Sequence, residues 1–239
     1  MGLSVGLFSV ISIFLISSRV NAQATNDTLA THVIINKVIN ALGGKEYLQS
    51  IKTLYTDTKT ELDGREVHYI VKEMFPNKGS FEIVYNNHTI YRSWFNGKEG
   101  FESSNGKVKK TDPDKFKDKK FKKNIFNEFD YLDSTLWRLE LDGEEVIDED
   151  TCFKIKGTFI TGFVKNIYYS KKTFLERKSE KMLSAEANRY SATLYSKYKR
   201  FNDLNYFTEI RFIDKDGKMK TGTIENLKIN QGIKESDFR

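Results

Sequence analysis

The region between Thr161 and Asn230 constrains the fold most, because its strand-like segments follow one another with only tight turns between them. Alternate positions in residues 206–213 form one more apolar face and one more polar face, as expected for a half-buried strand. An Asp-Lys-Asp-Gly turn at 214–217 comes next, and a second alternating segment follows. Gly217 can adopt the positive φ that such a turn needs. The region therefore predicts an antiparallel meander that ends in a β-hairpin.

One strand of this meander is expected to be apolar on both faces. Its two sets of apolar side chains are Phe163, Ile167 and Tyr169 on one face, and Val164 and Tyr168 on the other. A sheet with two apolar faces must be covered on both, because apolar side chains are unstable in water. The second face must therefore meet either helices of the same chain or a bound apolar ligand.

The N-terminal part of the chain predicts an amphipathic helix and then another meander. The helix begins at a cap formed by Asp27 or Thr28 and ends at Gly43-Gly44. A short helical turn over Lys45–Ser50 follows, and Asp63-Gly64 is then a strong hairpin signal. The helix buries positions at helical spacing, namely Ile35, Val38, Ile39 and Leu42. The expected strands are Thr53–Asp63, Glu66–Phe75, Ser80–Tyr85 and Thr89–Phe95.

The pattern becomes helical again in the middle of the chain. Asp112 is a good helix cap and Pro113 suits the first helical position, so one or two central helices are expected from there. One side of these helices is apolar, and the opposite side is rich in lysine. The apolar positions are Phe116, Phe121, Ile125, Phe126, Phe129 and Leu132.

The remaining elements complete a mixed fold. Asp142-Gly143 and the acidic stretch Glu144–Asp150 are expected to form turns, and Cys152–Phe159 a strand. The elements run in the order helix, strands, helix, strands, with connections too short for parallel pairing. The residues therefore predict an α+β fold with a large, curved antiparallel β-sheet, whose concave face is covered by the N-terminal and central helices.

Residues 1–22 are expected to be a signal peptide. Val5–Ile16 is an uncharged apolar run too short to span a bilayer comfortably, and Val20 and Ala22 place small residues where a signal peptidase reads them. An uncleaved membrane anchor is the alternative, because no Lys or Arg precedes the run. Cleavage leaves residues 23–239, whose length and uniform composition predict one exported, soluble domain.

The residue types that usually carry chemistry form no recognisable site. Cys152 is the single cysteine, and its strand-like neighbours predict a buried, unreactive thiol. The histidines His32, His68 and His88 lack the spacing of metal ligands. The acidic stretch 144–150 lacks the pattern of a calcium loop and is interpreted as a solvated turn. The sequence therefore indicates neither catalysis nor a cofactor or metal site.

Four stretches follow one another in an order that carries a resemblance. They are ALGGKE at 41–46 with IKTL at 51–54, WFNGKEG at 94–100, IYYSKKTFL at 167–175, and IENLKIN at 224–230 with Asp237-Phe238. In this order they resemble exported proteins of the outer-membrane lipoprotein-sorting group, the LolA/LolB-like superfamily. The resemblance covers most of residues 23–239, which are therefore expected to form a single LolA/LolB-like domain.

The resemblance implies a half-open β-barrel with helices as a lid, whose apolar interior accepts lipoprotein acyl chains or another lipid in the periplasm. Each buried methylene group contributes about 0.8 kcal/mol, so a modest cavity gives useful affinity. We therefore expect a periplasmic carrier or binding protein without a catalytic group. The alternative is a non-enzymatic module on the same scaffold, with a filled cavity and an envelope or outer-membrane protein as partner. A hydrolase would need a polar triad, which these residues do not supply.

The segment Lys107–Lys123 is strongly basic, and the whole chain carries a net charge of +6. Anionic lipid head groups or an acidic partner are the expected contacts of an exported basic protein, and nucleic acid is not expected. The alternative is a solvated helix face, since Asp114 and Asp118 are interspersed. The lysines are Lys107, Lys109, Lys110, Lys115, Lys117, Lys119, Lys120, Lys122 and Lys123.

A group of aromatic residues is expected to supply the lining of a ligand cavity. Core packing is the alternative for each of them, because large aromatic side chains dominate protein cores. The candidates are Tyr69, Trp94, Phe95, Phe116, Phe126, Trp137, Tyr168 and Phe212.

Overall fold

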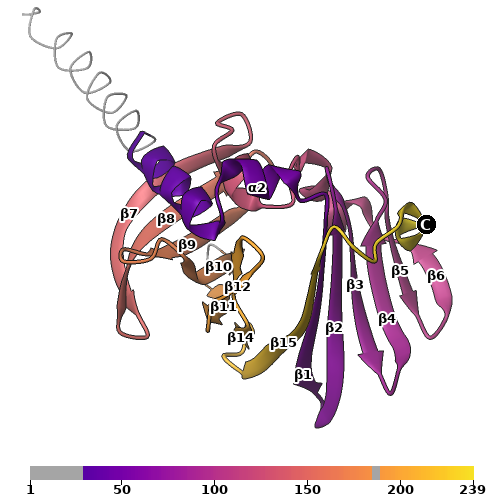
Figure 1. Cartoon of the computed structure of the whole chain (residues 1–239). Coiled ribbons are helices and arrows are strands. Elements are labelled where there is room, and N and C mark those ends of the chain that lie inside the picture. Colours follow the sequence, from indigo (N-terminus) through magenta and orange to yellow (C-terminus); the bar gives the residue numbers. More distant parts are fainter. Residues whose placement is uncertain (1–28, 185–188) are drawn as a thin grey trace, which may run out of the picture.

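The computed structural model describes residues 29–184 and 189–239, so the expected signal peptide at 1–22 and the expected cap at Asp27 or Thr28 lie outside the described residues. Within these residues, thirteen strands form one antiparallel sheet in the order β6-β5-β4-β3-β2-β1-β15-β14-β11-β10-β9-β8-β7, and β12 and β13 pair separately. Figure 1 shows the strong curvature of the sheet and the N-terminal helix and α2 lying across its open side. The predicted α+β fold with a curved antiparallel sheet is confirmed.

The strands before the central segment form a continuous meander. They are β1 (Thr53–Leu62), β2 (Arg65–Met74), β3 (Lys78–Tyr85), β4 (His88–Phe95), β5 (Gly100–Ser104) and β6 (Lys107–Lys110). The hairpin predicted at Asp63-Gly64 is confirmed, because both residues adopt positive φ between β1 and β2. Asn86 and Asn87 likewise adopt positive φ between β3 and β4. The basic strand β6 is an element that the sequence analysis assigned to no strand.

The strands after the central segment form the other part of the sheet. They are β7 (Trp137–Ile147), β8 (Asp150–Phe159), β9 (Val164–Ser170), β10 (Glu176–Ser184), β11 (Arg189–Ser196), β14 (Glu209–Ile213) and β15 (Met219–Ile229), with β12 (Lys199–Phe201) and β13 (Leu204–Tyr206) as the separate hairpin. The predicted C-terminal hairpin is confirmed, with Ile213 opposite Met219. β15 then pairs with β1, and Ile229 lies opposite Leu54. The last strand of the chain therefore joins the two meanders.

The N-terminal helix covers residues 29–42 of the described chain and is followed by α2 (Lys45–Ser50). Its apolar face is buried as predicted, since Ile35 and Val38 are fully inaccessible to solvent. Gly43 has a φ of +148°, and a Cβ there would lie 2.3 Å from the carbonyl oxygen of Asp203. A glycine is therefore required where the helix end meets the β12–β13 turn.

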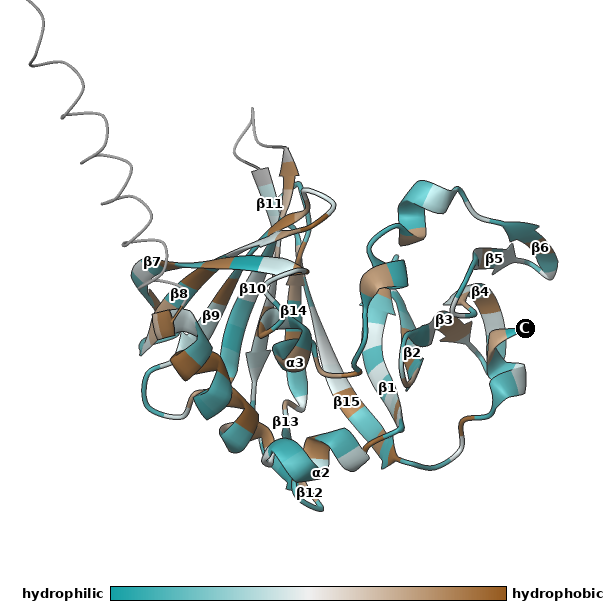
Figure 2. Ribbon diagram, turned by 90° about the horizontal axis from the view of Figure 1, so that it is seen from above, coloured by the Kyte–Doolittle hydropathy of each residue, from teal (hydrophilic) through white to brown (hydrophobic). Residues whose placement is uncertain are grey.

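The central segment forms short helical turns. They are the 3₁₀ helices η1 (Pro113–Phe116) and η2 (Lys119–Phe121), and the α-helix α3 (Asn127–Tyr131). Asp112 caps η1 as predicted, because its carboxylate accepts a hydrogen bond from the Asp114 amide. Lysines three and four residues apart repel one another along a continuous helix, which favours short turns here. In Figure 2 α3 lies inside the curve of the sheet.

The turns predicted at Asp142-Gly143 and over Glu144–Asp150 are wrong for most of these residues. β7 continues through them to Ile147, and the reversal occurs at Asp148 and Glu149, both of which have positive φ. The register between β7 and β8 shifts between Leu141 and Glu144, so residues 142 and 143 form a β-bulge. Asp-Gly is as suitable for a bulge as for a turn, because Gly143 supplies the positive φ that either needs.

β9 is buried on both faces, as its sequence predicts. Ile167 and Tyr169 belong to the main core with helix 29–42, whereas Tyr168 belongs to a small cluster with Cys152 on the other face. That cluster is covered by neighbouring strands: the Lys178 ammonium lies 4.7 Å from the centre of the Tyr168 ring. The expected cover by helices or a ligand is therefore wrong on this face, because the Lys178 side chain covers the ring while its ammonium pairs with Glu145 and Glu180.

The C-terminal 3₁₀ helix η3 (Glu235–Phe238) folds back onto β2 and β3. Phe238 is buried there, and Asp237 lies 3.6 Å from Lys72. In the described part of the chain, no helix is both long and apolar enough to cross a membrane.

Candidate ligand-binding site

A cavity of about 270 Å³, called the central cavity below, lies between helix 29–42, the segment that leads into α3, and strands of both halves of the sheet. Its apolar wall consists of Val38, Leu42, Leu54, Ile125, Phe126 and Ile210. The rest of its lining is polar or aromatic: Glu73, Lys122, Asn127, Glu128, Glu176, Tyr195, Tyr198, Asn205, Tyr206 and Phe207. The central cavity is therefore amphipathic, with an apolar wall and a polar wall.

The apolar wall exists because the sheet curves. Leu54 comes from β1 and Ile210 from β14, two strands that both pair with β15. Val38 and Leu42 lie on successive turns of helix 29–42 and face the same interior. All four side chains are buried, so the wall is preformed.

One ion-paired group connects the central segment to the sheet. Glu73 of β2 lies 3.0 Å from the Lys122 ammonium and 3.7 Å from that of Lys119. Burial opposes ionisation of Glu73, but the attraction of the two lysines outweighs it and lowers the pKa of the carboxyl below its ordinary value. Glu73 and Lys122 thus neutralise each other at the edge of the central cavity.

A β-bulge directs Glu176 into the central cavity. The register between β10 and β9 shifts between Glu176 and Lys178, so Arg177 is an extra residue in β10. Glu176 lies opposite Tyr169, which faces the core, whereas Lys178 lies opposite Tyr168 on the other face. The bulge therefore separates Glu176 from the lysine two residues later.

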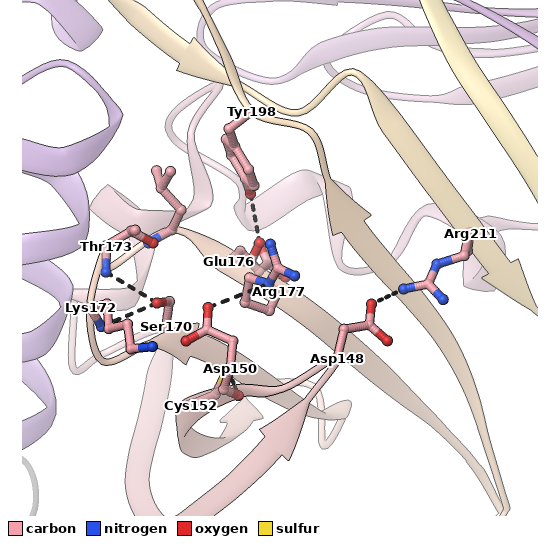
Figure 3. A network of polar contacts seen from close by, with 11 residues as sticks. Asp148, Asp150, Cys152, Ser170, Lys172, Thr173, Glu176, Arg177, Tyr198 and Arg211 are labelled. Carbon is pink, nitrogen blue, oxygen red and sulfur yellow. Dashed lines mark hydrogen bonds and ion pairs between the residues drawn. The ribbon is translucent and has the colours of Figure 1, made fainter.

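The turn before β10 fixes the start of the strand. The Ser170 hydroxyl accepts hydrogen bonds from the backbone amides of Lys172 and Thr173 (Figure 3). Figure 3 also shows Arg177 directed toward Asp150, with 3.6 Å between its Nε and the carboxylate. Arg177 is thus engaged on the outer face and is not available to neutralise Glu176.

Glu176 is half-buried as a residue, and a buried acid, Glu128 of α3, accompanies it. Glu128 is only 7% exposed, and its carboxylate accepts a hydrogen bond of 3.3 Å from the Tyr169 hydroxyl. Burial raises the pKa of the Glu128 carboxyl. Burial also raises the pKa of the Glu176 carboxyl to about 7, against the attraction of Lys165 and with repulsion from Glu128. Both acids therefore hold protons more tightly than exposed glutamates do.

The Glu176 carboxyl is incompletely satisfied by the protein. The Tyr198 hydroxyl donates a 2.7 Å hydrogen bond to the backbone carbonyl of Glu176 (Figure 3). A hydrogen bond from the Ser179 side chain opposes the rise that burial causes in the pKa of the Glu176 carboxyl, but among the described residues the buried Oε1 atom of this carboxyl has no hydrogen-bond partner. The central cavity thus contains a buried acceptor that the chain itself leaves open.

The tyrosines of the polar wall pack as a rigid aromatic surface. The Tyr195 and Phe207 rings lie 4.7 Å apart, and the Tyr206 and Phe207 rings 4.3 Å apart. The Tyr195 hydroxyl lies 3.1 Å from the Ser179 hydroxyl. Burial raises the pKa of Tyr195 and Tyr206, so both remain neutral hydrogen-bonding groups at physiological pH.

The structure distributes the eight aromatic candidates over several places. Phe126 lines the central cavity. The other seven lie elsewhere: Trp137 against Tyr131 and Phe159, Tyr168 in the outer cluster, Tyr69 near Phe212, Phe95 stacked on Phe116 beside a small pocket of about 110 Å³, and Trp94 stacked on Phe101. As ligand contacts, all eight stay predictions.

Sequence reasoning missed the two acids of the central cavity, Glu128 and Glu176. Glu128 lies three residues after Ile125 and four before Leu132, on the side of the helix expected to be apolar, and this interruption was a usable signal. Glu176 gave no such signal, because only the bulge in β10 turns it inward.

The lysine-rich segment does not form one helix face. Lys107, Lys109 and Lys110 lie on β6, and the later lysines lie on or beside the short turns. Six of the nine lysines are in ion pairs with Glu73, Glu99, Glu102 or Asp133. Much of the positive charge is therefore neutralised locally, and contact with an anionic membrane surface stays a prediction.

The cysteine and the histidines considered as possible reactive or metal-binding residues have the surroundings of structural residues. Cys152 is buried, and burial raises the pKa of its thiol to about 11. The Nδ1 atom of His68 lies 2.7 Å from the Asp57 carboxylate. His32 and His88 are both distant from His68 in the sequence. Over residues 29–184 and 189–239, no three His, Cys, Asp or Glu side chains are grouped to hold a metal ion.

Comparisons with known proteins identify the fold. No family model matches the chain, and no curated protein is similar to it in sequence. A DUF1329 family protein from Desulfovibrio piger superposes with a TM-score of 0.58 at 14% identity, over 87% of this chain and 96% of that one. A LolA superfamily protein from Nitrosomonas europaea gives a TM-score of 0.58 at 12% identity, over 86% and 96%.

A third solved structure has the same architecture. A putative outer membrane lipoprotein-sorting protein domain from Vibrio parahaemolyticus gives a TM-score of 0.55 at 13% identity, over 78% of this chain and 88% of that one. The chain therefore has a LolA/LolB-like fold, and the fold implied by the sequence resemblance is confirmed.

Proposed function

We propose that the protein is a periplasmic carrier or binding protein that holds an apolar ligand, an acyl chain of a lipoprotein or of another lipid, in the central cavity. The observation that supports this proposal is the preformed apolar wall formed by Val38, Leu42, Leu54 and Ile210. The similarity to a domain described as lipoprotein-sorting agrees with it. A carrier needs only such a surface, because burial of methylene groups supplies the binding free energy.

The size of the central cavity limits the ligand. Its volume of about 270 Å³ lies slightly below the range of about 300–1,000 Å³ that is usual for drug-sized ligands. We therefore expect part of one hydrocarbon chain to be held, rather than several chains at once.

The first prediction tests this ligand site. Ile210→Trp is expected to fill the central cavity and to weaken binding of a fluorescent fatty acid at least tenfold, because the indole occupies the volume of the chain. Displacement titrations of the purified protein measure this change, and mass spectrometry of gently purified protein identifies co-purified lipid.

Ile160→Trp is the matched control, since Ile160 is 58% exposed and lies outside the cavity lining. Circular dichroism and thermal unfolding verify that both variants fold. If Ile210→Trp unfolds, Ile210→Ala replaces it and is expected to change the preferred chain length. Unchanged binding by the folded cavity variant, or no lipid and no fatty-acid binding by the unmodified protein, contradicts the proposal.

An envelope protein-interaction module is the second candidate. The modest volume and the polar wall of the central cavity favour it over a carrier for bulky lipids. A stable complex with another envelope protein, formed equally by Ile210→Trp and by the unmodified protein in the absence of lipid, would support this candidate.

A further inference from the structure

The residues that line the central cavity include three acids, Glu73, Glu128 and Glu176, and fewer cations. Lys122 is its one lining cation within the described residues, and Glu73 already engages it at 3.0 Å. Lys165, which attracts Glu176, donates its hydrogen bond of 2.8 Å to the Tyr131 hydroxyl. Lys165 attracts both Glu128 and Glu176 from a distance, but among the described residues neither acid is in an ion pair.

The unpaired carboxylate oxygen of Glu176 destabilises the empty protein unless a ligand donates a hydrogen bond to it. A buried acceptor without a partner loses its hydrogen bond to water and gains none in return. The Oε1 atom of Glu176 is such an acceptor among the described residues, and the β10 bulge holds it there. Unsatisfied buried groups are rare in folded proteins and call for a specific explanation, and a hydrogen-bond donor on a ligand would satisfy this one.

The apolar and polar walls lie within a single cavity. Leu54 and Ile210 offer a surface for a hydrocarbon chain, and Glu128 and Glu176 line the same space. We propose that the central cavity selects an amphiphile with a single apolar chain and a protonated primary amine, and that the ammonium group binds beside Glu176 and Glu128. This inference rests on the proposed function, because it identifies the head group of the same ligand.

The chemistry of the two walls excludes other head groups. An ammonium group offers three donors and a positive charge to two acids. A carboxylate or phosphate head would instead place a negative charge beside two buried acids, which is unfavourable at short range. A neutral hydroxyl head could donate one hydrogen bond to Oε1 but would gain no charge attraction.

The surroundings of Glu176 agree with this choice. The titratable groups that face it are Glu128 of α3, Lys165 of β9, and the neutral tyrosines Tyr195, Tyr198 and Tyr206. Because burial raises the pKa of Glu176 to about 7, the empty site is partly protonated at neutral pH. An ammonium ligand favours the ionised carboxylate, so binding is measured at pH 8, where the amine is still protonated.

The test compares three ligands of equal chain length: decylamine, decanol and decanoate. Isothermal titration of the purified protein at pH 8, below the micelle concentrations of the ligands, is expected to give at least tenfold tighter binding for decylamine than for decanol, and the weakest binding for decanoate. Glu176→Gln is expected to weaken decylamine binding at least tenfold and to leave decanol binding within twofold. Glu225→Gln on the exposed face of β15 is the matched control and should change neither affinity.

The outcomes separate this inference from the proposed function. Equal binding of decylamine and decanol, or an unaltered decylamine affinity in Glu176→Gln, overturns the head-group inference and leaves the carrier function standing. No binding of any of the three ligands contradicts the carrier function itself. If Glu176→Gln does not fold, Glu128→Gln provides the same comparison, because Glu128 lines the same wall.

Discussion

Glu176 owes its position to one extra residue in β10. The bulge at Arg177 turns Glu176 toward the central cavity, while Arg177 itself is directed to Asp150 on the outer face. A regular strand would place Glu176 and Lys178 on one face, where the two charges could pair. A local irregularity thus leaves a buried carboxyl whose protonation is coupled to folding.

The second prediction concerns this coupling. Because the pKa of Glu176 is about 7 in the folded protein and 4.5 is its reference value, the folded state binds this proton more tightly than the unfolded state between these pH values. The stabilisation that comes from tighter proton binding by Glu176 is therefore fully present below pH 4.5 and is lost as the pH rises to about 7. The expected loss is about 2–3 kcal/mol, allowing for partial solvent contact.

Urea unfolding of the unmodified protein and of Glu176→Gln measures this loss. The stability difference between them should shift in favour of Glu176→Gln from pH 4.5 to pH 7.5, because glutamine does not ionise. The comparison cancels acids that do not interact with Glu176, such as Glu73 and Asp133, whose pKa values are lowered in the folded protein. A difference that stays constant over this range contradicts the coupling.

Among the secondary structure elements, those with a strong local signal were predictable from the sequence. The strands on either side of Asp63-Gly64 and the helix ending at Gly43-Gly44 follow from turn chemistry and periodicity. β7 was not predictable, because Asp142-Gly143 signals a turn and a bulge equally well. The pairing of β1 with β15, and with it the central cavity, depends on contacts distant in sequence that no local pattern encodes.

The third prediction concerns the element that closes the central cavity. Glu73→Gln is expected to destabilise the protein by about 1–3 kcal/mol, because Lys119 and Lys122 would remain partly buried without their carboxylate partner. Hydrogen exchange should increase mainly over residues 113–131, and urea unfolding gives the free-energy change.

Glu99→Gln provides the comparison for this variant. Its ion pair with Lys110 is largely exposed, so its removal should change stability by less than about 0.5 kcal/mol. Equal effects of the two substitutions would show that the Glu73 ion pairs do not hold the central segment in place.

In the whole molecule, one strand connects the two meanders. β15 pairs with β1 on one side and with β14 on the other. Gly222 allows this close packing, because a Cβ there would lie 2.6 Å from the Thr58 side chain and 3.1 Å from that of Ile210. The apolar wall of the central cavity thus depends on the correct pairing of β15 with β1 and β14.

The fourth prediction follows from this connection. Gly222→Val is expected to destabilise the whole protein by about 2 kcal/mol or more and to weaken ligand binding, because overpacking at this contact pushes β1 and β14 apart. Thr223→Val, at the exposed neighbouring position, should be nearly neutral. Thermal unfolding monitored by tryptophan fluorescence and by circular dichroism measures both variants, and an unchanged melting temperature for Gly222→Val contradicts the prediction.

The place of β15 also determines when this chain can fold. Leu54 pairs with Ile229, so the middle of the sheet is filled by a strand that is 175 residues away from its partner in the sequence. A chain in which β15 has not yet docked has two separate meanders with unpaired edges, and it gains the stability of the joined sheet only when β15 pairs with both of them.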